Sequence, residues 1–129
     1  MGILLVAAEV PVSERSIIER VLTHYVIRVH EVATYKLAIE DLARDRFSIV
    51  LLYAFNADGD IGVTDAIRIM KQIVPELLIV AVSDEKPFES EKELRCSGLY
   101  YYLTRPFTDR ELSEALSGAI ETQTRRKAR

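Results

Sequence analysis

Five short apolar segments alternate with amphipathic segments along most of the chain. A short continuous apolar run favours a buried strand, whereas apolar residues at three- and four-residue spacing favour a helix. The expected strands lie at residues 3–6, 26–32, 47–55, 77–83 and 99–104. Alternating strands and helices are typical of a parallel sheet covered on both faces, because right-handed crossovers put the helices there. The pattern therefore predicts one doubly wound α/β domain.

The segments between the strands predict helices, four from clear apolar spacing and one from a weaker pattern. Apolar residues recur at helical spacing after Ser13, after Thr34, and within residues 63–74 and 109–123. Ser13 and Thr34 are candidate N-caps, because their hydroxyls can accept a hydrogen bond from the first turn. Residues 84–97 are charged and only weakly amphipathic, so we expect a short helix there.

Length, charge and cysteine content exclude several classes of function. We expect one domain at residues 1–123, with residues 124–129 forming a basic, frayed tail or the start of a linker. A net charge of -3 argues against nucleic-acid binding by the domain itself. Cys96 is the only cysteine, so no internal disulfide or cysteine-based zinc site can form. No apolar stretch is long enough to cross a bilayer and no signal-peptide pattern is present, which predicts a cytoplasmic protein without membrane contacts.

The candidate site lies where the predicted strands end. In doubly wound sheets, ligands bind beyond the carboxyl ends of the strands. The residues that follow the strands are Ala7, Ala8 and Glu9, then 53–60, then Ser83 and Asp84, and finally 104–107.

Residues 97–112, SGLYYYLTRPFTDREL, carry the most specific motif in the chain. Together with the alternation, which covers nearly all of the chain, this motif resembles the receiver domains of response regulators in two-component signalling. Those domains have a glycine, an aromatic-rich fifth strand and then lysine, proline and phenylalanine before the last helix. Here Arg105 stands at the lysine position, followed by Pro106 and Phe107. Ser83 matches the family's serine or threonine, and Tyr102 matches its aromatic switch position.

The resemblance implies a chemotaxis-receiver-like, flavodoxin-like domain with strand order 2-1-3-4-5 and a usually cis bond before the proline. It also aligns the family's acidic pair with Ala7 and Ala8, and its phosphate-accepting aspartate with Tyr53. Magnesium requires oxygen ligands, which alanine lacks, and a phenol is neutral at pH 7. A shift of one residue brings only Glu9 into the second acidic position. The alignment thus predicts a degenerate pseudo-receiver with no catalytic residue, no metal and a lost magnesium site.

Several residues near this site remain open to two interpretations. Asp58 and Asp60 follow Tyr53 by five and seven residues, and the sequence favours a solvated turn over an alternative phosphoacceptor. Arg105 suits an anion, yet pairing with Glu9 or another acid at the strand ends is favoured. Ser83 suits an oxyanion and a loop backbone group equally well.

Tyr100, Tyr101 and Tyr102 predict an interaction face on the fifth strand. At least one ring should be exposed if this strand is a sheet edge, and tyrosine is enriched at interfaces. The resemblance implies a protein partner, namely a histidine kinase, an output domain or a second copy of the chain. Nucleic acid would be reached only through a missing output domain.

Three functions are compatible with these patterns. The favoured one is a receiver-like signalling module of a phosphorelay, not an enzyme, that acts by protein–protein interaction without accepting a phosphoryl group. The second is a receiver phosphorylated at a non-standard acid, in the region of Glu9, Asp58 or Asp60. The third is a flavodoxin-like domain that binds a small molecule, which is disfavoured because the first loop, AAEVPVS, has no glycine to cradle a phosphate.

Overall fold

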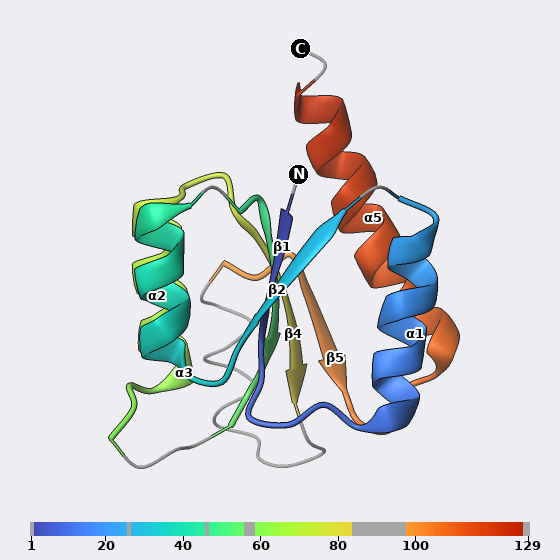
Figure 1. Ribbon diagram of the computed structural model, residues 1–129, viewed down its shortest axis with the longest axis horizontal. Helices are drawn as coiled ribbons and strands as arrows, with labels where there is room; N and C mark the ends of the chain where they lie inside the picture. Colours follow the sequence, from blue (N-terminus) through green and yellow to red (C-terminus); the bar gives the residue numbers. More distant parts are fainter. Residues whose placement is uncertain (1, 26, 46, 56–58, 84–97, 128–129) are drawn as a thin grey trace.

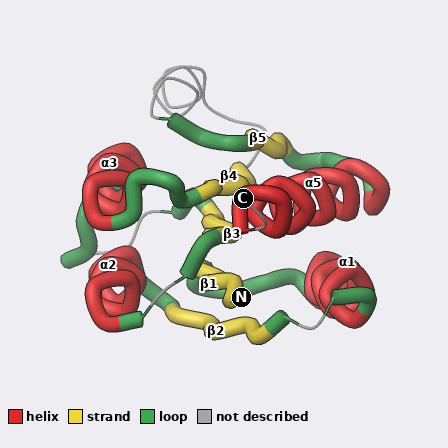
Figure 2. The backbone as a smooth tube through the Cα atoms, turned by 90° about the horizontal axis from the view of Figure 1, so that it is seen from above, coloured by secondary structure: helices red, strands yellow, loops and turns green. Residues whose placement is uncertain are grey.

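The computed structural model describes residues 2–25, 27–45, 47–55, 59–83 and 98–127. Its five strands are β1 (Gly2–Val6), β2 (Arg28–Val32), β3 (Ile49–Tyr53), β4 (Leu78–Ser83) and β5 (Tyr101–Thr104). They form one sheet in the order β2-β1-β3-β4-β5, and every neighbouring pair is parallel. Figure 2 shows this order along the sheet. The predicted fold class and strand order are confirmed.

Within the described residues, four helices cover the two faces of the sheet. They are α1 (Val12–Thr23), α2 (Tyr35–Arg44), α3 (Val63–Ile73) and α5 (Asp109–Lys127). Helices α1 and α5 lie on one face and α2 and α3 on the other (Figure 1). The helix predicted at residues 84–97 lies outside the described residues. Among the residues described, no helix is both long and apolar enough to span a bilayer.

Alternate residues of β1 pack into the two layers. Ile3 and Leu5 belong to the core shared with α1 and α5, while Leu4 and Val6 belong to the core shared with α2 and α3. Successive side chains of a strand point to opposite faces, so a strand covered on both sides must be apolar throughout. This requirement explains the continuous apolar runs, since each fully buried leucine contributes about 2 kcal/mol relative to an exposed one.

The observed ends of two helices differ from the predicted ones. Ser13 does not cap α1, which begins one residue earlier, after Pro11, without a side-chain cap. Thr34 does cap α2 as predicted, because its hydroxyl oxygen accepts from the Leu37 amide at 3.2 Å. Helix α5 continues to Lys127, one turn beyond the end predicted near residue 123. Arg126 in the added turn donates to the Glu76 carbonyl at 3.0 Å.

Candidate functional site

Four of the residues singled out in the sequence lie at the carboxyl edge of the sheet, the lower end in Figure 1. Ala7 follows β1 and continues its pairing, because its amide donates to the Val32 carbonyl at 3.1 Å. Tyr53 is the last residue of β3 and Ser83 the last of β4. The Arg105 amide donates to the Ser83 carbonyl at 2.9 Å, which ties the chain after β5 to the end of β4.

Tyr53, Glu14 and Arg105 form a compact hydrogen-bonded group, here called the edge cluster. The Tyr53 hydroxyl donates to Glu14 Oε1 at 2.7 Å. Arg105 grips the same carboxylate with two donors, Nε to Oε2 and Nη2 to Oε1, each at 3.0 Å. This fork is the two-point geometry in which arginine binds carboxylates most strongly. Each carboxylate oxygen of Glu14 therefore accepts from at least one edge-cluster donor.

The edge cluster is largely shielded from solvent. The side chains of Glu14 and Arg105 are 12% and 29% exposed, and Tyr53 is buried. The Arg105 guanidinium carbon also lies 5.2 Å from the centre of the Tyr53 ring. Burial raises the pKa of Tyr53, and its hydrogen bond to Glu14 raises that pKa further. Tyr53 is consequently a neutral hydrogen-bond donor at physiological pH.

Arg105 pairs with Glu14, an acid other than Glu9, for which the sequence had also allowed. Glu9 and Ala8 are both exposed, whereas Glu14 sits in the first turn of α1, which begins at this edge. Glu14 was not among the residues that the sequence predicted for the site. The signal that could have identified it is an acid in the first turn of a helix whose start lies at the carboxyl edge of the sheet.

Tyr35 fixes the chain directly after Tyr53. Its side chain is fully buried, and its hydroxyl donates to the Tyr53 carbonyl at 2.8 Å. The same oxygen accepts from the Phe55 amide at 3.0 Å. The centres of the Tyr35 and Phe55 rings lie 4.7 Å apart. Burial raises the pKa of Tyr35 to about 12. Sequence analysis did not identify this residue, whose role depends on contacts with a strand 18 residues away.

Asp60, in the partly exposed loop before α3, accepts three backbone hydrogen bonds. Its carboxylate accepts from the amides of Tyr35 at 2.8 Å, Ile61 at 2.9 Å and Lys36 at 3.2 Å. It therefore joins the loop after β3 to the first turn of α2. Burial acts to raise the pKa of Asp60, but the three backbone donors outweigh it and hold that pKa below its usual value. Asp58, the other acid considered in this loop, lies outside the described residues.

Asp60→Asn should lower the free energy of unfolding by about 1 kcal/mol at pH 7, because an amide offers one acceptor oxygen where the carboxylate offers two. The folded-state pKa of Asp60 is depressed, so its contribution is present above the unfolded-state pKa and is lost as pH falls through the folded-state value. Urea unfolding at pH 7 and near pH 2.5 should show the difference from the parent protein shrinking in acid. Asp65→Asn, at a 66% exposed side chain on α3, is the control and should change little. A pH-independent deficit would contradict this role.

The three tyrosines at and just before β5 divide between core and surface. Tyr102 packs against the core shared with α2 and α3. Tyr101 and Tyr100 are 45% and 38% exposed, and β5 is an edge strand. The Tyr100 hydroxyl lies over Gly118 of α5, where an added Cβ would be only 3.0 Å away. The Arg105–Pro106 peptide bond is cis, as the resemblance implied.

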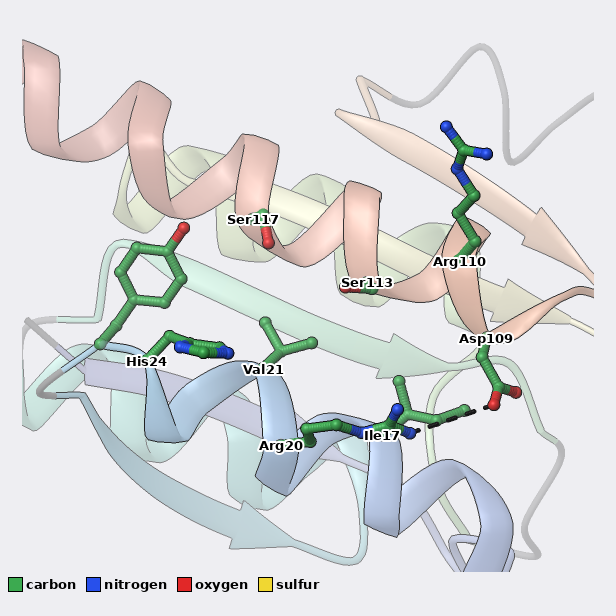
Figure 3. Close-up of a pocket in the computed structure, with 9 residues that line it drawn as sticks. Ile17, Arg20, Val21, His24, Asp109, Arg110, Ser113 and Ser117 are labelled. Atoms are coloured by element: carbon green, nitrogen blue, oxygen red, sulfur yellow. Dashed lines mark ion pairs between the residues drawn. The ribbon is translucent and has the colours of Figure 1, made fainter.

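A separate hollow of about 270 Å³ lies between α1 and α5 (Figure 3). Apolar side chains from α1 and serines from α5 line it, and an ion pair from Arg20 to Asp109 at 4.0 Å crosses one end. The described lining residues are Ile17, Arg20, Val21, His24, Tyr25, Asp109, Arg110, Ser113 and Ser117. They include none of the residues predicted for the site, so this hollow is distinct from the edge cluster.

Several solved structures similar to this chain are receiver domains. The chain aligns with a CheY-like response regulator receiver domain protein from Methanospirillum hungatei JF-1 at a TM-score of 0.78 and 17% identity, over 97% of each chain. It aligns with the signal receiver domain of an HD domain-containing protein from Pseudomonas fluorescens Pf-5 at 0.77 and 22% identity, over 95% of this chain and 96% of that one. For the beryllofluoride-activated DrrB receiver domain, the TM-score is 0.73 and the identity 20%, over 93% and 97% of the two chains. No protein-family model matches the sequence, and no curated protein does so. The likeness shows the receiver-domain fold.

Proposed function

We propose that this chain is a receiver-like module of a two-component signalling system that acts through protein contacts and does not accept a phosphoryl group. The observation that carries the proposal is the edge cluster: Tyr53, aligned with the phosphoacceptor, donates to a carboxylate that Arg105 also binds. The receiver-domain fold supports the signalling role. Such a module has no catalytic activity of its own.

The described side chains at this edge do not suit magnesium. Phosphoryl transfer to a carboxylate needs a hard cation with oxygen ligands. Ala7 carries only a methyl group, Tyr53 is a neutral phenol, and the Glu14 carboxylate already neutralises Arg105. Within the described residues, no three histidine, cysteine or acidic side chains are grouped to hold a metal ion. We therefore assign no step to magnesium.

Protein contacts would most readily involve the exposed start of β5 and the residue before it. Tyr100 and Tyr101 offer large rings with polar tips, a combination favoured at interfaces. The partner would be a histidine kinase, an output domain or a second copy of the chain. The contact would take place in the cytoplasm. Nucleic acid would be contacted only through an output domain.

Amide NMR spectra with magnesium and beryllofluoride, a phosphoryl mimic, test the proposal. We expect no shifts around Ser83, Tyr102 and Arg105, and no phosphoryl adduct in intact-mass spectra after treatment with acetyl phosphate. A phosphorylatable receiver domain treated in parallel is the positive control. Saturable, magnesium-dependent shifts or a stable adduct would overturn the proposal.

The same experiments address the two competing functions. Peptide mapping of any adduct would distinguish Glu9 from the region of Asp58 and Asp60. Asp60 is a weaker candidate phosphoacceptor than Glu9, because both of its carboxylate oxygens accept backbone hydrogen bonds. A thermal-shift panel of nucleotides and flavins tests small-molecule binding, for which no change in melting temperature is expected.

A further inference from the structure

We infer that Tyr53 and Arg105 form an oxyanion-binding site that the chain fills from within, with the Glu14 carboxylate as its ligand. This inference rests on the proposed function and deepens it, since it names what occupies the edge of the sheet in place of a phosphoryl group. The ligand class is a small carboxylate or an oxyanion of similar size, held by one neutral hydroxyl donor and one guanidinium fork.

The donors and the acceptor come from different parts of the fold. Tyr53 ends a strand that is buried along its whole length, and Arg105 is anchored through its amide to the Ser83 carbonyl. Glu14 comes from the first turn of α1, 39 residues before Tyr53 and 91 before Arg105. Removing the Glu14 carboxylate would therefore leave both donor residues attached to the carboxyl edge of the sheet, within reach of an added anion.

The contacts are those an external anion would make. Glu14 Oε1 accepts from both the Tyr53 hydroxyl and Arg105 Nη2, and Oε2 accepts from Arg105 Nε. Charge-assisted bonds of this kind are about twice as strong as neutral ones. The Glu14 side chain is only 12% exposed, so water competes weakly for these donors. A free carboxylate in the position of the Glu14 carboxylate would meet the same donors of Tyr53 and Arg105.

Because the Glu14 carboxylate is part of the chain, the parent protein should not bind free anions at this site. A ligand attached to its own site has a high effective concentration, so a dissolved anion at ordinary concentration cannot displace it. The ion pair would hold the connection after β5 in one arrangement without any modification. Regulation would then depend on partners that contact α1 or this connection.

Chemical rescue of Glu14→Ala tests the inference. Sodium formate or sodium acetate is titrated against sodium chloride at equal ionic strength, and the melting temperature is followed. A ligand that binds only the folded state raises its stability with concentration. We expect a saturable rise of roughly 3 °C or more for Glu14→Ala, and none beyond the chloride effect for the parent protein. Formate should also shift the Arg105 Nε–H resonance of the variant.

Two further variants serve as controls. Glu31→Ala removes another carboxylate gripped by an arginine fork, in this case from Arg15 at 2.9 and 3.0 Å rather than from Arg105. It should show no rescue. Glu14→Ala combined with Arg105→Met lacks the fork and should lose the rescue. If Glu14→Ala is unfolded without anion, recovery of its circular dichroism signal replaces the melting temperature as the readout.

Absence of a saturable effect on Glu14→Ala, or an equal effect in the double variant, would overturn the inference. Inorganic phosphate, titrated separately, shows whether the site also admits a dianion. The parent protein with magnesium and beryllofluoride is run alongside. Magnesium-dependent NMR shifts of the parent protein with beryllofluoride would refute the proposed function. Failed rescue of Glu14→Ala without such shifts in the parent would refute only the inference of an internal ligand.

Discussion

Arg105→Met is expected to lower the free energy of unfolding by about 2–3 kcal/mol. The substitution keeps much of the aliphatic stem but leaves the Glu14 carboxylate, only 12% exposed, with one fewer partner and no compensating charge. Breaking a buried ion pair by removing one member costs about 3–5 kcal/mol, and the 29% exposure of the Arg105 side chain reduces that figure through solvent screening. Urea unfolding of the parent and the variant at pH 7 measures the difference.

A double-mutant cycle assigns this loss to the edge cluster. Glu14→Gln should cost about 2 kcal/mol in the parent and clearly less in the Arg105→Met background, because the two side chains share one interaction. Arg15→Met is the matched control, since it breaks a fork to Glu31 in which both side chains are 41% exposed. It should have a much smaller effect. Equal losses for Arg105→Met and Arg15→Met, or additive losses in the cycle, would show that the edge cluster does not stabilise the fold.

The sheet could be predicted because its strands are under a simple constraint. A parallel strand covered on both faces must be apolar at every position, and β3 and β4 are buried along their whole length. Such runs stand out in a sequence, and their alternation with helices limits the topology to very few arrangements. The end of α5 was harder to predict, because its last turn is basic and carries no apolar signal. Gln123 and Arg126 instead hold that turn through hydrogen bonds to backbone carbonyls.

The edge of the sheet could be located, but its contacts could not. Strand ends are fixed by the alternation, so Ala7, Tyr53, Ser83 and Arg105 were assigned to one edge from sequence alone. The acid that meets Arg105 depends on how far α1 is rotated on the sheet, which packing decides and a single sequence does not encode locally. The same holds for Asp60, whose partner in α2 lies 25 residues earlier. Polar contacts between residues far apart in the sequence could therefore not be predicted from the sequence alone.

Tyr35→Phe should be the second strongly destabilising substitution, with a loss of about 2–3 kcal/mol. The ring stays buried, but the variant removes the donor to the Tyr53 carbonyl and the acceptor for the Phe55 amide. Leaving buried backbone groups without partners costs about 1–3 kcal/mol. Tyr101→Phe, at a 45% exposed ring, is the control and should be near neutral. Hydrogen exchange at the Phe55 amide should accelerate in Tyr35→Phe and not in the control.

The pH dependence separates the hydroxyl of Tyr35 from simple packing. Burial raises its folded-state pKa to about 12, above the usual value of 10.0 in the unfolded chain. A raised folded-state pKa means that the contribution of Tyr35 is complete below pH 10 and is lost as pH rises toward 12. Between pH 10 and 12, the free energy of unfolding of the parent protein should therefore fall more steeply than that of Tyr35→Phe. The difference between the two free energies should narrow. A difference in the free energy of unfolding that stays constant from pH 8 to 11.5 would mean that burial does not raise the pKa of the Tyr35 phenol in the folded state.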